Sequence, residues 1–482
     1  MPTHSPRLVG ARVTPNVSQD AVVIVPGIMG SALRDTTTGR PLWGLRPDWY
    51  ARAWAGRETL RALMLTDDER AGRIGRVEAT GLLRFPAFSP MLAGFEPYTT
   101  LCDRIRAMVA SPKAVLEFAY DWRLPVAYNA SRLAAEAAEH LTRWRACPEH
   151  EAARQTRPDH RPAQLVLVAH SMGGLLCRAI AQDSDDIRAT ITLGTPFDGA
   201  AKAAVLFSSG RGAALPRRRL RRLAATLPGL HDLLPMYRCV DDGDDVRRLT
   251  PADVAALGGD EELARAAQES HARLAQVRLA GHRAVIGTEQ PTVSSLELRD
   301  GVVRELHHSF LLHSDGEFVR DPDGILRRVD RRGDGTVPRN SANPVGAEPV
   351  AVPQQHGPIA TADEAISFVC SVITEQDADL GPRLGEGDIG LDLPDVVTPG
   401  AEWAAIVTGV APHEATCTVT DLQTGLAVDH PPLHRRDGRV QATVGLPEPG
   451  LFRIAVSGGG TTPVSQLVMA EQPGDDPLDD DE

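Results

Sequence analysis

Apolar and polar residues alternate along most of the chain in a pattern that predicts short buried strands separated by helices. The predicted strands are apolar, β-branched runs at residues 21–25, 114–118, 165–168, 189–193 and 282–286. The predicted helices lie at residues 131–146 (with Ser131 as N-cap), 175–182 and 362–372. Strands that alternate with helices are typical of parallel βαβ units. We therefore predict an α/β fold in which helices cover both faces of a mostly parallel sheet.

Two regions depart from this alternation. Residues 198–280 have a helical pattern without intervening strands, which indicates an inserted cap. Glycine and charged residues dominate residues 381–390, and we predict a linker over residues 377–392. Short alternating runs separated by turn residues follow at residues 403–408, 416–420, 440–444 and 451–456. Their spacing predicts a small β-sandwich of immunoglobulin-like size over residues 393–470.

The composition narrows the classes of function. The 482 residues carry a formal net charge of −13, which argues against a nucleic-acid partner because such a partner requires a basic face. We expect disorder in the polar residues 1–19 and in the acidic tail, residues 471–482. The six cysteines show no CxxC spacing and suggest neither a metal site nor a disulfide framework. Without a signal-peptide pattern or an apolar run of about 20 residues, the expected location is the cytoplasm.

The strongest chemical signal is a serine placed between a predicted strand and a predicted helix. Ser171 follows the apolar run 165–168 and is flanked by the small residues Ala169 and Gly173. This is the arrangement of a nucleophile elbow, a sharp turn that raises a serine hydroxyl above the end of a buried sheet. Small neighbours are needed because the strained turn leaves little room for side chains. We identify Ser171 as the candidate nucleophile.

A serine hydroxyl needs a base, and the base needs a carboxylate that fixes its tautomer. In α/β-hydrolases the order along the chain is serine, acid, histidine. Asp334 lies between two glycines in a short loop and is the candidate acid, although an ordinary Asp-Gly turn explains the same pattern. His356 lies downstream, just before the predicted helix 362–372, and is the candidate base.

Acyl transfer also needs hydrogen-bond donors for the oxyanion that forms on the substrate. One donor is expected from the residue after the nucleophile, which is Met172. The other is expected from the loop that follows the strand at residues 21–25. We assign it to the backbone N–H of Ile28, with Met29 as the second choice.

These motifs together resemble the bacterial branch of the lecithin:cholesterol acyltransferase family, a group of α/β-hydrolases. The matching segments are residues 25–31, 42–44, 119–124, 169–173, 193–196 and 333–338, together with His356. The segments Tyr120 to Arg123 and Gly333 to Pro338 are the most specific of them. The resemblance implies an α/β-hydrolase domain over residues 20–376, a triad of Ser171, Asp334 and His356, and activity on acyl esters of lipids. Ala169 departs from the family pattern, which usually has glycine there.

Two further groups of residues are candidates for the substrate pocket. Trp122 belongs to a segment that either shapes the acyl pocket or forms a packed structural corner. Leu220, Leu223 and Leu227 recur at helical spacing among arginines. We interpret them as a mobile lid that contacts a membrane surface, against the alternative of an ordinary solvated helix face.

The leading hypothesis is a serine acyltransferase or lipase that acts on lipid esters without a metal or other cofactor. One alternative is a carboxylesterase with soluble substrates. The other is an inactive interaction protein that binds a protein partner through the predicted β-sandwich. The order and placement of the three candidate residues favour an enzyme.

Overall fold

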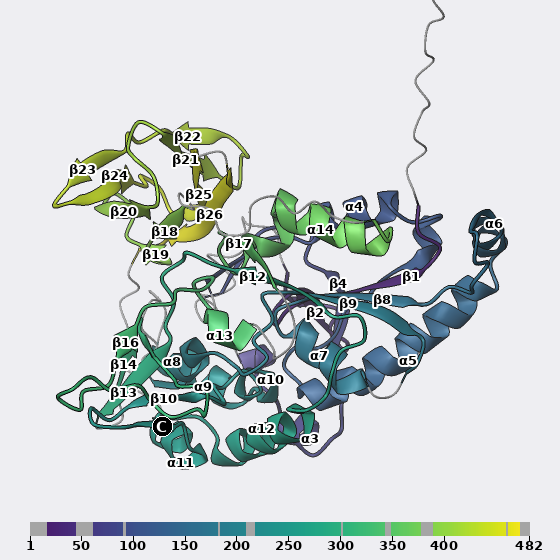
Figure 1. Cartoon of the computed structure of the whole chain (residues 1–482), viewed down its shortest axis with the longest axis horizontal. Coiled ribbons are helices and arrows are strands. Elements are labelled where there is room, and N and C mark those ends of the chain that lie inside the picture. Colours follow the sequence, from purple (N-terminus) through teal and green to yellow (C-terminus); the bar gives the residue numbers. More distant parts are fainter. Residues whose placement is uncertain are drawn as a thin grey trace, which may run out of the picture.

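A computed structural model describes residues 17–44, 61–89, 93–181, 184–208, 217–299, 302–342, 349–376, 389–458 and 461–472. Its centre is a six-stranded sheet with the strand order β17-β12-β9-β8-β1-β7 (Figure 1). All neighbouring strands in this sheet are parallel. The strands are β1 (Ala21–Val25), β7 (Val115–Glu117), β8 (Leu165–His170), β9 (Ile187–Leu193), β12 (Arg283–Gly287) and β17 (Val350–Val352).

Helices cover both faces of the central sheet. The helices α4 (Thr99–Ala107) and α14 (Asp363–Ile373) lie on one face, and α5 (Val126–Arg145) and α7 (Gly173–Ile180) lie on the other (Figure 1). The strands β1 and β8 are buried throughout, as expected for a sheet enclosed on two sides. Shorter elements near them are α6 (Pro148–Thr156), α13 (Arg339–Ala342), η1 (Pro112–Ala114) and η2 (Pro358–Thr361). The predicted α/β fold, with helices on both faces of a parallel sheet, is confirmed.

One helix boundary differs from its prediction. Helix α5 begins at Val126, five residues before the predicted N-cap. Ser131 instead lies inside the helix, where its hydroxyl donates to the backbone carbonyl of Ala127. The earlier start follows from Pro125, which ends the preceding loop, and from Asp232, whose carboxylate accepts a hydrogen bond from the backbone N–H of Val126.

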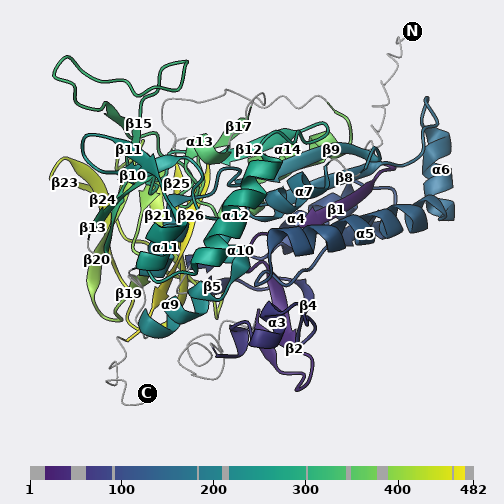
Figure 2. The ribbon, with the colours of Figure 1, turned by 90° about the horizontal axis from the view of Figure 1, so that it is seen from below.

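A small antiparallel sheet projects from one side of the central sheet (Figure 2). Its order is β3-β2-β4, and a separate hairpin pairs β5 with β6. The elements of this region are β2 (Ser31–Asp35), β3 (Pro41–Trp43), α3 (Asp67–Arg70), β4 (Val77–Leu82), β5 (Ala87–Ser89) and β6 (Ala93–Phe95). Residues 45–60 lie outside the described part.

The segment predicted as a helical cap contains both helices and strands. Its helices are α8 (Ala201–Ser208), α9 (Arg217–Ala225), α10 (Pro228–His231), α11 (Pro251–Ala256) and α12 (Glu261–Leu274). It also contributes β10 (Arg238–Asp241) and β11 (Val246–Arg248), which the pattern did not predict. These join β13 (Ser295–Arg299) and β14 (Val302–Leu306) in a four-stranded sheet, and β15 (Ser309–Phe310) pairs with β16 (Arg328–Val329).

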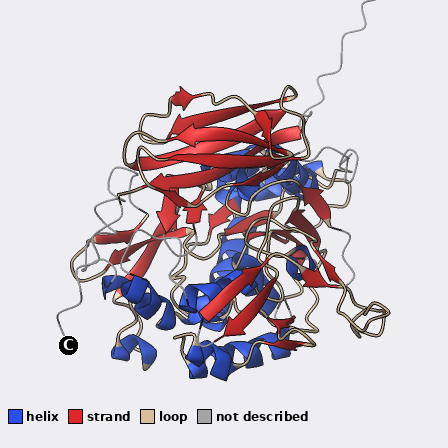
Figure 3. Cartoon of the chain, turned by 90° about the vertical axis from the view of Figure 1, so that its left-hand side faces the viewer, coloured by secondary structure: helices blue, strands red, loops and turns tan. Residues whose placement is uncertain are grey.

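The C-terminal strands form two mostly antiparallel sheets that pack together beside the central sheet (Figure 3). The first has the order β18-β20-β24-β23 and the second β19-β26-β25-β21-β22. The strands are β18 (Gly390–Asp392), β19 (Val396–Val397), β20 (Glu402–Thr408), β21 (Ala415–Asp421), β22 (Ala427–Asp429), β23 (His434–Arg436), β24 (Arg439–Gly445), β25 (Gly450–Gly458) and β26 (Thr461–Ala470). Strand β18 lies inside the predicted linker.

Parts of the predicted termini and linker lie outside the described residues, namely 1–16, 377–388 and 473–482. Ser18 and Gln19, which were predicted to be disordered, are buried, and the backbone N–H of Ser18 donates to the carbonyl of Met108. All six cysteines are free thiols. Within the described ranges, none of the helices combines the length and the apolar character that crossing a membrane requires.

Candidate active site

Ser171 lies in the turn between β8 and α7, at the carboxyl end of the central sheet. Its backbone φ is +53°, a left-handed conformation that non-glycine residues rarely adopt. The turn is tight because the start of α7 packs directly on the end of β1. A Cβ on Gly173 would lie 2.6 Å from the backbone carbonyl oxygens of Val25 and Pro26. The local sequence therefore forms the strained strand-to-helix turn that the pattern predicted.

The structure brings Ser171, His356 and Asp334 into one hydrogen-bonded row, although they are far apart in sequence. Nε2 of His356 lies 2.8 Å from Oγ of Ser171, and Nδ1 lies 2.7 Å from Oδ2 of Asp334. Because a carboxylate only accepts hydrogen bonds, Nδ1 carries the proton and Nε2 is left as the acceptor for the serine hydroxyl. This tautomer is the one that a general base requires.

Asp334 is held by its own loop and is almost fully buried. Its Oδ1 accepts hydrogen bonds from the backbone N–H groups of Thr336 and Val337, at 3.0 and 2.6 Å. Its backbone carbonyl accepts from the N–H of His356 at 2.7 Å. The other carboxylate oxygen is thus left for the imidazole. The sequence pattern at Asp334 was also compatible with an ordinary Asp-Gly turn. That turn is present, and it directs the carboxylate of Asp334 toward the imidazole of His356.

The loop after β1 lies directly against the serine. A Cβ on Gly27 would be 2.8 Å from Cβ of Ser171, so only glycine allows this approach. Ile28 lines the pocket beside Ser171, while Met29 is fully buried with a φ of +60°. Among the described hydrogen bonds, none uses the backbone N–H of Ile28, Met29 or Met172. These N–H groups remain available to a ligand, with Ile28 placed nearest the pocket.

Tyr98 and His170 form a buried network that the sequence did not predict. The hydroxyl of Tyr98 accepts from the N–H of Gly27 at 3.0 Å and lies 2.7 Å from Nδ1 of His170. Nε2 of His170 lies 3.0 Å from the backbone carbonyl of His356 and must donate to it, since a carbonyl only accepts. Burial, together with repulsion from the imidazole of His356, lowers the pKa of His170 to about 3. His170 is therefore neutral and links the two loops that flank Ser171.

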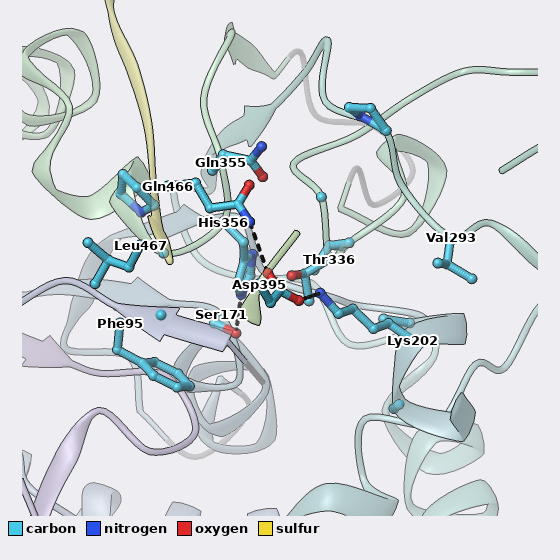
Figure 4. A pocket seen from close by; sticks show the side chains of 18 of the residues that line it. Phe95, Ser171, Lys202, Val293, Thr336, Gln355, His356, Asp395, Gln466 and Leu467 are labelled. Carbon is cyan, nitrogen blue, oxygen red and sulfur yellow. Dashed lines mark hydrogen bonds and ion pairs between the residues drawn. The ribbon is translucent and has the colours of Figure 1, made fainter. Parts of the chain in front are cut away.

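The serine opens onto a cavity of about 360 Å³ (Figure 4). Phe95 and Leu467 lie on one side of Ser171. On the other side, Nζ of Lys202 lies 3.8 Å from a carboxylate oxygen of Asp395. The cavity thus has an apolar side and a polar side, with the candidate nucleophile between them.

The four residues predicted to shape the pocket or lid lie elsewhere. Leu220, Leu223 and Leu227 are buried in the hydrophobic core, and none of them is among the described lining residues. The apolar face of α9 packs inward, and Arg221 is held by the backbone carbonyls of Phe207 and Leu257. The structure therefore corrects the pocket assignment: this face is core rather than exposed lid. The side chains of residues 217–219 lie outside the described set.

Trp122 is also a core residue, which favours the structural corner over the pocket. It is fully buried, its Nε1 donates to the backbone carbonyl of Ser31, and it packs edge-on against Trp43. The adjacent Arg123 is fully buried as well, and its guanidinium pairs with Asp121 and Glu69. Buried charges of this kind need such partners, and the segment holds the corner together.

Comparison with known proteins supports part of this picture. Residues 83–268 match the family model described as Lecithin:cholesterol acyltransferase, which confirms the resemblance seen in the sequence motifs. The matched segment contains Ser171, whereas Ile28, Asp334 and His356 lie outside it. A comparison with curated proteins finds no match.

Two solved structures show weaker likenesses. The crystal structure of the Tle4–Tli4 complex covers 73% of this chain and 98% of its own, with 15% identity and a TM-score of 0.44. A crystal structure of an engineered protein covers 95% of each chain, with 11% identity and a TM-score of 0.16. Both likenesses are low, so the fold described above rests on the strand order and direction alone.

Proposed function

We propose that this protein is a serine-dependent enzyme that removes the acyl group from lipid esters and transfers it to water or to an alcohol. The observation that supports this function best is the row from Ser171 Oγ through His356 to Asp334, with contacts of 2.8 and 2.7 Å. The family match over residues 83–268 supports the same class of reaction.

In the first step, Oγ of Ser171 attacks the ester carbonyl while Nε2 of His356 takes the hydroxyl proton. Asp334 keeps the imidazole oriented and stabilises its cationic form. The negative charge that forms on the carbonyl oxygen is stabilised by the N–H groups of Ile28 and Met172. Such donors are each worth about 3–4 kcal/mol of transition-state stabilisation. His356 then passes its proton to the leaving alcohol.

In the second step, the acyl group on Ser171 is attacked by an acceptor. His356 removes the proton of that acceptor, and the same N–H groups stabilise the second oxyanion. Water as acceptor releases a fatty acid, and an alcohol as acceptor gives a new ester. None of these steps requires a metal or an organic cofactor.

A lipid ester fits the two-sided cavity better than a small soluble ester does. Phe95 and Leu467 offer an apolar surface next to Ser171, and the Lys202–Asp395 pair offers a polar surface opposite. An ester with a long acyl chain and a polar alcohol portion matches both. A soluble-substrate carboxylesterase is the second candidate, and the dependence of activity on acyl length separates the two.

A fluorophosphonate probe tests the proposal directly, because it labels only an activated serine. We expect the wild-type protein to be labelled and Ser171→Ala to lose the label, while the matched control Ser131→Ala on α5 keeps it. Labelling that persists in Ser171→Ala would refute the assignment. Absence of labelling in the wild-type protein would favour the inactive interaction protein. Product analysis with a mixed phospholipid and sterol pool then distinguishes hydrolysis from acyl transfer.

A further inference from the structure

The C-terminal β-sheets contribute directly to the cavity at Ser171. Their lining residues are Leu391, Asp392, Leu393, Asp395, Gln466 and Leu467. These residues come from β18, from the segment before β19 and from β26. Together they form one wall of the cavity, which we call the C-terminal wall, from segments that are distant in sequence. The C-terminal region is therefore one side of the cavity rather than a separate appendage.

Leu467 packs tightly against strand β6 on the other side of the cavity wall. A Cβ on Gly94 in β6 would lie 2.2 Å from Cβ of Leu467, so the absence of a side chain at position 94 is what admits the leucine. Leu467 belongs to the same hydrophobic core as the central sheet. Its neighbour Val468 points the other way, into the core between the two C-terminal sheets. This alternation follows from the side-chain period of a strand.

The wall is fixed in place by polar contacts. The guanidinium of Arg453 in β25 donates to both carboxylate oxygens of Glu96, at 2.8 and 2.7 Å. Gln354, two residues before His356, donates to the backbone carbonyl of Pro463 and accepts from the N–H of Ser465, at the start of β26. Two-point contacts of this kind hold both position and orientation. Leu467 thus has a fixed place relative to Ser171.

The two sides of the cavity define which part of an ester goes where. Asp395 is contacted by Lys202 at 3.8 Å and by Nε2 of Gln466 at 2.9 Å, so this side suits the polar alcohol portion (Figure 4). The acyl chain is left with the apolar side, between Phe95 and Leu467. Burying each CH₂ group against such a surface contributes about 0.8 kcal/mol, so the depth of the surface controls which chain lengths react well.

We propose that Leu467, supplied by the C-terminal β-region, is a specificity-determining residue that sets the acyl-chain length accepted by Ser171. The inference rests on the proposed acyl-ester function and adds a role for the C-terminal strands. It assigns the recognition of the acyl chain to a segment that lies outside residues 83–268, the part that matches the family.

The test uses the full chain and nitrophenyl esters that share one alcohol and differ only in acyl length. For Leu467→Ala we expect the ratio of kcat/KM on long chains to that on butyrate to rise by about three- to tenfold, because the wall recedes by the volume of several methyl groups. For Leu467→Trp we expect the ratio to fall at least about tenfold. The matched control is Val468→Ala, which alters the other face of β26 and should leave the ratio unchanged.

Fluorophosphonate labelling of each variant separates the two proposals. If the wild-type protein is not labelled, the proposed function fails. If labelling is retained and the chain-length profiles of wild type, Leu467→Ala and Leu467→Trp coincide, the role of Leu467 fails.

Should the tightly packed Leu467→Trp not fold, Leu393→Trp replaces it, because Leu393 is only half-buried and lines the same wall. A change in Val468→Ala equal to that in Leu467→Ala would also overturn the inference.

Discussion

Tyr98 holds His170 through its hydroxyl, with 2.7 Å between Oη and Nδ1, and the same oxygen accepts the N–H of Gly27. Gly27 begins the loop that carries Ile28, and His170 donates to the backbone of His356. One phenol therefore connects the candidate oxyanion loop with the loop of the candidate base. The connection is made inside the core, where an unpaired polar group is costly.

Tyr98→Phe should damage both stability and activity. Removing the hydroxyl leaves the N–H of Gly27 and Nδ1 of His170 without their partner, and each buried unpaired group costs about 1–3 kcal/mol. Displacement of the loop that carries Ile28 should lower kcat by about tenfold or more. Urea denaturation and nitrophenyl ester kinetics measure the two effects. Tyr128→Phe on the exposed side of α5 is the control, and an equal response of both variants would show that the network has no special role.

Gly27→Ala should lower kcat/KM by about a hundredfold while leaving most of the fold intact. The added Cβ would lie 2.8 Å from Cβ of Ser171 and 3.4 Å from its Oγ, so the loop and the serine have to separate. An increase of even 1 Å at a reacting centre costs about a hundredfold in rate. Labelling by a fluorophosphonate and kcat/KM provide the readout. The control Gly445→Ala adds the same methyl group where the nearest atom is 3.9 Å away, and activity should be unchanged there. Normal labelling of Gly27→Ala would contradict the prediction.

The central sheet was predictable because its strands are locally encoded. Runs such as residues 21–25 and 165–168 are apolar throughout, and a buried parallel strand requires this. Strand β17 was missed since its three residues are too short to carry a pattern. Strand β26 was missed as well, although it is ten residues long, because polar residues such as Gln466 interrupt its apolar pattern.

The residues of the candidate site also fall into those that the sequence could predict and those that it could not. Ser171, Asp334 and His356 could be selected because each lies in a motif of small residues with a known order. The Tyr98–His170 network could not, since it joins residues 72 positions apart through contacts that only the folded chain creates. The leucines of α9 were misassigned for a physical reason: the spacing of Leu220 and Leu223 shows that one face is apolar but not what covers it.

Gln355 connects His356 to the C-terminal strands, and its loss should reduce kcat more than it raises KM. Its Nε2 donates to the backbone carbonyl of Leu391 at 2.8 Å and lies 3.3 Å from Oε1 of Gln290. The isosteric Gln355→Met removes both contacts next to the base, and we expect about a tenfold lower kcat with KM changed by less than about twofold. Gln155→Met on the exposed face of α6 is the control. A rise in KM at constant kcat would assign Gln355 to substrate binding instead of positioning.

Acidification should destabilise the protein, in part through His170. The folded pKa of this residue is lowered to about 3 by burial and by the nearby imidazole of His356, whereas an unfolded histidine titrates near 6.5. Between these values the unfolded chain binds a proton that the folded chain does not, so the free energy of unfolding falls as the pH falls. The expected slope is about 1.4 kcal/mol per pH unit below pH 6.5 for this one group. Other histidines with lowered pKa values, such as the buried His231 and the half-buried His282, add to the slope.

Replacement of His170 isolates its share of that slope. His170→Asn keeps an acceptor for the hydroxyl of Tyr98 but cannot titrate, so between pH 7.5 and pH 5.5 its free energy of unfolding should fall by about 1.4 kcal/mol less than that of the wild-type protein. Urea denaturation at the two pH values measures the difference. The control His413→Asn changes a histidine whose side chain is 83% exposed and should reproduce the wild-type slope. A His170→Asn variant that loses as much stability on acidification as the wild-type protein would mean that His170 takes up protons over this pH range as readily in the folded as in the unfolded chain, so that burial does not lower its pKa.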